Sequence, residues 1–129
     1  MVYLSIDMMK SLKNFCLFIL MTIFLLLSVS CGPITREIKY EVTGTIPVAD
    51  ITYANFTAET DKLADVTLPW SKSFTVAIDY SDYFTARLSA SKYTSGSLTA
   101  NIYVNGTLVK TSTDSGSHPS VSIYESIWN

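Results

Sequence analysis

The chain has 129 residues and a formal net charge of −2, from 9 basic and 11 acidic side chains. The lysines and arginines form no cluster, which argues against nucleic acid as a partner. Both cysteines, Cys16 and Cys31, lie in the first quarter of the chain. The remaining residues therefore contain neither a disulfide nor a Cys/His metal spacing, and we expect no cofactor.

Residues 1–30 have the composition of a bacterial signal peptide. Two lysines precede an apolar run at 15–27, and small residues then lead into Cys31. A cysteine in this place resembles the lipobox of bacterial lipoproteins, in which the thiol receives a diacylglyceryl group. Ser28 stands where a leucine is usual, so the lipobox is a loose one. We predict lipidation at Cys31, and we interpret residues 1–8 as a misassigned start.

Two other interpretations of the same segment stay open. The apolar stretch from Phe15 to Val29 is about 15 residues long, which is at or below the roughly 17 to 25 residues that a transmembrane helix needs. An uncleaved anchor would borrow flanking residues, and ordinary cleavage would release the domain. In the lipoprotein interpretation, residues 31–37 are the anchor cysteine and a short tether, and residues 38–129 form the folded domain.

From residue 36 onward, apolar and polar side chains alternate with a period of two, and β-branched and aromatic residues dominate. This pattern is typical of strands with one buried face. It predicts strands at 38–43, 49–53, 63–68, 74–78 and 84–90, a hairpin within 98–111, and a last strand at 120–124. About seven short strands without a helical apolar stripe predict an all-β fold, an immunoglobulin-like two-sheet β-sandwich.

The strongest local signal is Asn105-Gly106, which calls for a two-residue type I′ turn between alternating strands. A regular hairpin would place Tyr103 opposite Leu108 on its outer face. The other predicted pairs are Val104 with Thr107, Ile102 with Val109, Ala100 with Thr111, and Asn101 with Lys110. The Tyr103–Leu108 pair serves either as cross-strand support or as part of a contact surface.

Several phrases of the sequence resemble one family. They are Tyr-x-Val-Thr-Gly at 40–44, Leu-Pro-Trp at 68–70 and Gly-Ser-Leu-Thr at 96–99. Their order is similar to that of the mycobacterial membrane protein small (MmpS) family, over nearly all of residues 38–116. The resemblance implies a short N-terminal anchor, an extracytoplasmic β-sandwich, and a role as accessory partner of resistance-nodulation-division transporters that export lipids and siderophores. The chain departs from the family at Ala100, where a cysteine is usual, and in its lipobox-like end.

Four side chains are candidates for contact with a partner. Trp70 either closes one end of the sandwich together with Phe74, or forms a recognition tip beside Lys72. Tyr103 and Leu108 are the outward pair of the hairpin. Tyrosine and tryptophan combine a large apolar area with a polar tip, which suits them to recognition surfaces.

Catalytic groups are sparse. The single histidine, His118, lies in a turn-like Ser/Gly/Pro segment, and a triad with Asp114 would lack the Gly-x-Ser-x-Gly elbow. The paired carboxylates do not have calcium-loop spacing and are expected to solvate turns; they are Asp61 with Asp65 and Asp79 with Asp82. We expect a protein that is not an enzyme and holds no metal.

These observations together predict a bacterial cell-envelope lipoprotein, held on the extracytoplasmic side of a membrane through its lipid anchor. Its non-catalytic sandwich would bind other proteins, in the manner of an accessory subunit of an envelope transporter. The alternatives are a surface module that binds a lipid, a small ligand or a glycan, and a structural or adhesive envelope protein.

Overall fold

The computed structural model describes residues 10, 12, 14 and 32–129. The predicted signal peptide and the lipidation site Cys31 thus lie outside the described residues, apart from three isolated positions. Residues Gly32–Asn129 form one compact unit. Within the described part of the chain, no helix is both long enough and apolar enough to cross a membrane.

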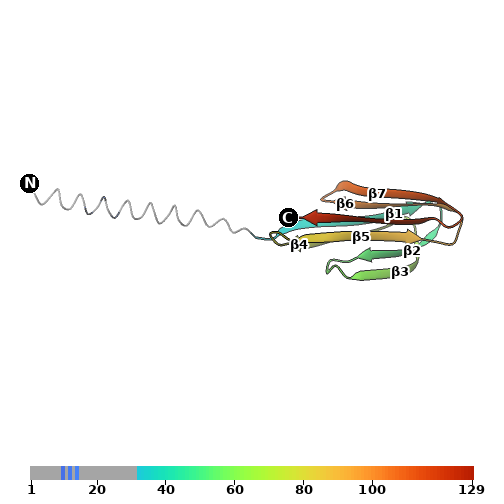
Figure 1. Cartoon of the computed structure of the whole chain (residues 1–129), viewed down its shortest axis with the longest axis horizontal. Helices are drawn as coiled ribbons and strands as arrows, with labels where there is room; N and C mark the ends of the chain where they lie inside the picture. The colour runs from blue at the N-terminus through green and yellow to red at the C-terminus, as the bar shows by residue number, and fades with distance from the viewer. Residues whose placement is uncertain (1–9, 11, 13, 15–31) are drawn as a thin grey trace, which may run out of the picture. The chain divides into compact units, whose positions relative to one another are not determined.

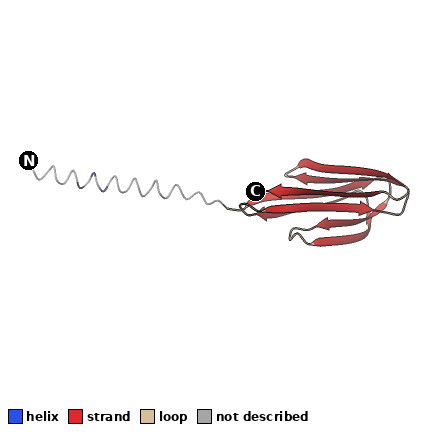
Figure 2. Cartoon of the chain, in the orientation of Figure 1, coloured by secondary structure: helices blue, strands red, loops and turns tan. Residues whose placement is uncertain are grey.

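The compact unit is built from eight strands (Figures 1 and 2). Their bounds are β1 Ile34–Gly44, β2 Val48–Ala54, β3 Thr60–Thr67, β4 Trp70–Ile78, β5 Tyr83–Ser91, β6 Gly96–Val104, β7 Thr107–Gly116 and β8 Ser120–Trp128. The predicted all-β sandwich is confirmed, with eight strands in place of about seven.

The strands form two four-stranded sheets, in the orders β4-β1-β6-β7 and β3-β2-β5-β8. Every pair within them is antiparallel. The chain passes between the sheets several times, so each sheet contains strands that are distant in sequence. Two antiparallel sheets that pack face to face bury one row of side chains from each strand and leave the other row in solvent.

Strand β1 begins earlier than predicted. Ile34 already pairs with Ile78 of β4, so residues 34–37 belong to the sheet and not to a tether. The sequence does not show the alternation of apolar and polar residues here, because the charged Arg36 occupies the same row as Ile34 and Ile38. The segment between Cys31 and the folded domain is therefore shorter than the predicted 31–37.

The hairpin between β6 and β7 has the predicted turn and a different register. Asn105 and Gly106 both have positive φ, 49° and 80°, as a type I′ turn requires. Val104 pairs with Thr107 and Tyr103 with Leu108, as predicted. A β-bulge at Val109 then shifts the register, and this corrects three predicted pairs. Ile102 faces Lys110, Asn101 faces Thr111 and Ala100 faces Ser112.

The bulge places polar side chains in the inner row of β7. Because Ile102 and Leu98 point into the core, their partners Lys110 and Asp114 lie on the same side of the sheet. Lys110 Nζ lies 3.9 Å from a carboxylate oxygen of Glu125 on β8. The Asp114 carboxylate accepts a hydrogen bond of 2.8 Å from the backbone nitrogen of Ser120, at the start of β8. Charged groups thus connect the β7 and β8 edges of the two sheets.

Aromatic rings fill part of the space between the sheets. Tyr40 lies 5.8 Å from Tyr53 and 5.5 Å from Phe74, measured between ring centroids. Tyr53 lies 5.4 Å from Trp70, and Phe74 lies 6.0 Å from Phe84. Rings at these separations and inclinations are packed as in protein cores. The series links β1, β2, β4 and β5, and aliphatic side chains complete the core.

The Tyr40 hydroxyl ties the two sheets together. It donates a hydrogen bond of 2.9 Å to the carbonyl oxygen of Ala54 and accepts one of 3.3 Å from the backbone nitrogen of Arg87. Burial raises the pKa of the phenol, because the phenolate would lose its water. The side chain is completely buried, so its polar atom needs these two partners.

The motif glycine at the end of β1 allows a close backbone approach. A Cβ atom on Gly44 would lie 2.1 Å from the carbonyl oxygen of Ser97, which is an impossible contact with backbone. Thr45 then donates a hydrogen bond of 3.1 Å to the same oxygen. The glycine of the Tyr-x-Val-Thr-Gly phrase is thus needed for the path of the chain out of β1.

Candidate interaction surface

The outer row of the β4-β1-β6-β7 sheet carries a polar network centred on Glu41. One carboxylate oxygen accepts hydrogen bonds from Asn101 Nδ2 at 3.1 Å and from the Tyr103 hydroxyl at 3.2 Å. The other accepts one from Lys39 Nζ at 3.1 Å. Thr111 donates a hydrogen bond of 2.6 Å to Asn101 and extends the network onto β7. We call these five residues the Glu41 network.

Strand geometry explains why these side chains meet. Ile38, Tyr40 and Val42 fill the core side of β1, so the alternating positions 39 and 41 point outward. Across the ladder, Lys39 pairs with Tyr103 and Glu41 pairs with Asn101. The network therefore follows from the β1–β6 register.

The charges in the Glu41 network stabilise each other. The hydrogen bond from Asn101, followed by those from Lys39 and Tyr103, lowers the pKa of Glu41 against a smaller opposing effect of burial. Partial burial, reinforced by the Glu41 carboxylate, raises the pKa of Tyr103. Lys39 Nζ also lies 4.9 Å from the centroid of the Tyr103 ring, within range of a cation–π contact. Near neutral pH the carboxylate stays ionised and each group keeps its partners.

Exposed apolar side chains border the Glu41 network. Leu108 lies opposite Tyr103 and is 47% exposed, and Val109 at the bulge is 39% exposed. The polar network and these apolar side chains lie on the neighbouring strands β1, β6 and β7. We call these residues together the outer-face surface.

The structure separates the four predicted contact residues into two groups. Tyr103 and Leu108 lie together on the outer-face surface. Trp70 is partly buried and packs on the core through Tyr53. Lys72 pairs with the buried Tyr40, so it lies in the inner row of the edge strand β4, where it is exposed. These two residues do not belong to the surface formed by Tyr103 and Leu108, and a contact role for any of the four stays a prediction.

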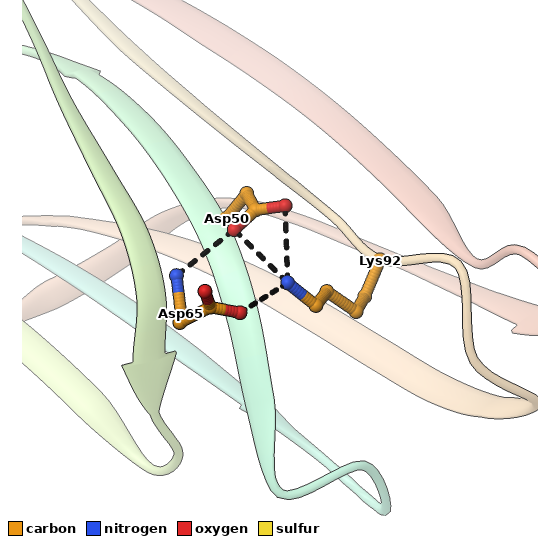
Figure 3. A network of polar contacts seen from close by, with 3 residues as sticks. All are labelled: Asp50, Asp65 and Lys92. Atoms are coloured by element: carbon orange, nitrogen blue, oxygen red, sulfur yellow. Dashed lines mark hydrogen bonds and ion pairs between the residues drawn. The ribbon is translucent and has the colours of Figure 1, made fainter.

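A second polar cluster lies on the other sheet and was not foreseen from the sequence (Figure 3). Lys92 Nζ lies 3.2 and 3.3 Å from the two carboxylate oxygens of Asp50 and also contacts the carboxylate of Asp65. The backbone nitrogen of Asp65 donates a hydrogen bond of 2.9 Å to Asp50. This bond lies where the β2–β3 register shifts and Asp65 has a φ of 52°.

In this cluster one lysine is shared between two carboxylates. The backbone N–H of Asp65, with Lys92 as the second cause, lowers the pKa of Asp50. Asp65, followed by Asp50, raises the pKa of Lys92. The prediction that Asp61 and Asp65 solvate turns was wrong, because both lie within β3. Asp79 and Asp82 do lie in a turn, where Asp82 donates a backbone hydrogen bond to Asp79.

Lys92 also borders a small surface depression between the β5–β6 and β7–β8 connections. Its lining residues are Ser91, Lys92, Tyr93, His118, Pro119 and Ser120. The rings of Tyr93 and His118 lie edge to face at 4.9 Å. The His118 ring contacts the hydroxyl of Ser117 at 3.1 Å, while Asp114 is bonded to the Ser120 backbone. The carboxylate that a triad would require is therefore engaged elsewhere.

These features define a small β-sandwich domain with an apolar core and a preorganised polar face. The sequence model of the family described as Mycobacterium membrane protein matches residues 30–123. The chain belongs to this family, in agreement with the resemblance of its sequence motifs to the MmpS family. A search of curated proteins gave no match. Family membership indicates an envelope protein associated with a membrane.

Proposed function

We propose that this protein is a non-catalytic envelope lipoprotein whose sandwich binds a partner protein, as an accessory subunit of a resistance-nodulation-division transporter. The lipid on Cys31 would hold it on the extracytoplasmic side of the membrane. The observation that carries the proposal is the outer-face surface, in which Glu41 is fixed by three side chains beside exposed Leu108.

Several properties of this surface suit a protein partner. Its polar groups are already held by each other, so a partner need not order flexible side chains when it binds. Tyrosine is enriched in protein interfaces, and the neighbouring Leu108 and Val109 supply apolar contact area. A sheet face also offers broad contact in place of the concave pocket that small ligands require.

The interior gives less support to a ligand held between the sheets. Tyr40, Tyr53 and Phe74 occupy the space that such a ligand would need. The non-catalytic part of the proposal rests on His118, because its ring lies next to Ser117 and Tyr93 and lacks a carboxylate partner among the described residues. A base without such an orienting group is poorly placed to activate a nucleophile.

Site-specific photocrosslinking in native membranes tests the partner. A photoreactive phenylalanine analogue at position 108 is expected to capture a large membrane transporter. The matched control is the same analogue at Tyr124, which is 68% exposed on the outer row of β8 in the other sheet. Capture that is equal at the two positions, or absent at position 108, would contradict binding through the outer-face surface.

The lipid anchor requires a separate test. Metabolic labelling with palmitate should mark the wild-type chain and leave Cys31→Ala unlabelled in the native host. Label that persists in the variant would overturn the lipoprotein assignment without affecting the crosslinking result.

A second candidate function is glycan binding at the depression beside Lys92. Tyr93 is 88% exposed and its ring is braced by His118, as in aromatic platforms that stack on sugars. If this function holds, envelope glycans will shift the NMR signals of Tyr93 and His118, and Tyr93→Ala will abolish the shifts. Glycans that leave both signals unchanged would remove this candidate.

A further inference from the structure

One end of the sandwich gathers the start of β1 and the end of the chain. Ile34 pairs with Ile78, and the Asn129 side chain donates a hydrogen bond of 2.9 Å to the carbonyl oxygen of Ile78. Tyr83 at the start of β5 pairs with Trp128 at the end of β8. Figure 1 shows the C-terminus beside the first residues of β1. We call this region the amino-terminal end of the sandwich.

Three exposed aromatic side chains cluster at this end. The rings of Tyr83 and Trp128 lie 4.7 Å apart between centroids, with their planes tilted by 37°, yet the side chains are 52% and 60% exposed. Tyr80, in the β4–β5 turn just before Tyr83, is 77% exposed. Their large apolar area faces water, whereas the rings between the sheets are packed.

The length of the chain limits how far this end can lie from a membrane anchor. Cys31 precedes Ile34 by three residues, and the apolar stretch from Phe15 to Val29 ends five residues before it. An extended chain spans at most about 3.3–3.6 Å per residue, so these distances are about 10 and 18 Å. The limit holds for a lipidated Cys31 and for an uncleaved apolar anchor alike.

We propose that Tyr80, Tyr83 and Trp128 contact the headgroup region of the bilayer and hold the sandwich against the membrane. This proposal rests on the membrane attachment in the proposed function, and it is independent of the transporter partner. Tryptophan and tyrosine concentrate at membrane–water interfaces because their rings are amphipathic.

The charges at this end bear on which lipids it fits. Asp79 and Asp82 are exposed on either side of Tyr80 and Ser81 in the β4–β5 turn, and Glu37 near the start of β1 is also exposed. The one basic side chain among these first residues of β1, Arg36, is half-buried. Acidic side chains here oppose attraction to anionic headgroups. The contact therefore depends on the aromatic rings, and a zwitterionic bilayer suffices for it.

Fluorescence quenching of the full chain tests the contact. The chain has two tryptophans, so Trp70→Phe leaves Trp128 as the only reporter and Trp128→Phe leaves Trp70 as the matched control. Each variant is reconstituted in phosphatidylcholine vesicles whose acyl chains are brominated near the headgroup. Trp128 is expected to be quenched at least about twofold more strongly than Trp70, because an interfacial indole lies close to these bromines.

A further variant separates adhesion from mere proximity. Adding Tyr80→Ser and Tyr83→Ser to the Trp128 reporter is expected to reduce the quenching to the level of Trp70. Equal quenching of Trp128 and Trp70, or quenching of Trp128 that the serine substitutions leave unchanged, would overturn the contact.

Two further measurements distinguish the lipid contact from the membrane attachment and from contact with a protein. Vesicle flotation of the same samples reports the attachment itself. A chain that floats without extra quenching removes only the lipid contact, and a chain that fails to float removes both the attachment and the contact. Capture of a protein, and not of lipid, by a photoreactive analogue at Tyr80 in native membranes would assign this end to a protein partner instead. The crosslinking result at position 108 is unaffected by these outcomes.

Discussion

The inner and outer rows of the β4-β1-β6-β7 sheet use tyrosine in opposite ways. Tyr40 on β1 is completely buried, and its hydroxyl is bonded to two backbone groups of the other sheet. Tyr103 on the neighbouring β6 is partly exposed, and its hydroxyl is bonded to the side chain of Glu41 on its own sheet. The first arrangement joins two sheets, and the second orders a surface. The row in which each tyrosine lies thus decides whether its hydroxyl meets the backbone of the other sheet or a side chain of its own sheet.

The largest expected effect comes from shortening an inner-row side chain. Ile102→Ala is expected to lower the free energy of unfolding by about 2–5 kcal/mol, because it leaves a cavity beside packed neighbours. Leu108→Ala on the outer row should change it by no more than about 0.5 kcal/mol. Denaturant unfolding of both variants measures the contrast, and similar losses would mean that the outer row is also part of the core.

The two tyrosine hydroxyls provide a finer comparison. Tyr40→Phe keeps the ring but leaves the buried Ala54 carbonyl and the partly buried Arg87 N–H without their partner, so we expect a loss of about 1–3 kcal/mol. Tyr103→Phe should leave the unfolding free energy nearly unchanged and instead reduce the photocrosslink at position 108. If Tyr103→Phe destabilises the domain as much as Tyr40→Phe, the assigned roles are wrong.

The smallest expected effect is a dependence on pH. The folded state lowers the pKa of Glu41 below its ordinary value of 4.5, so the ionised carboxylate stabilises the domain above that pH. This contribution is lost as the pH falls from 4.5 through the lower pKa of the folded state. All other ionisable groups are common to wild type and Glu41→Gln, so their effects cancel in the difference between the two unfolding free energies. This difference should shrink over the same pH range. A difference that stays constant between neutral pH and pH 3 would show that the Glu41 network contributes nothing through its charge.

Most of the fold could be predicted because buried apolar rows leave a period of two in the sequence. Ile38, Tyr40 and Val42 are a clear example, and Asn105-Gly106 marked its turn equally well. The register beyond that turn could not be predicted. Strand β7 is mostly polar and almost entirely exposed, so no buried apolar row fixes which residues face inward.

The candidate surface could be predicted only where local chain geometry determines it. The turn brings Tyr103 and Leu108 together, and this pair was expected. Glu41 joins them through the β1–β6 pairing, across 62 residues of sequence from Tyr103. The contacts of Lys92 with Asp50 and Asp65 join the β2 and β3 strands to the residue after β5, which alternation alone does not indicate.

The β7 register has a consequence for how copies of the protein behave when crowded in a membrane. Strands β3, β4, β7 and β8 are the four sheet edges, and each has a charged residue in its inner row. These residues are Asp61, Lys72, Lys110, Asp114 and Glu125. An incoming strand would have to cover these charges, which discourages edge-to-edge polymerisation. Neighbouring copies can therefore be concentrated on one membrane without their edge strands pairing into a continuous sheet.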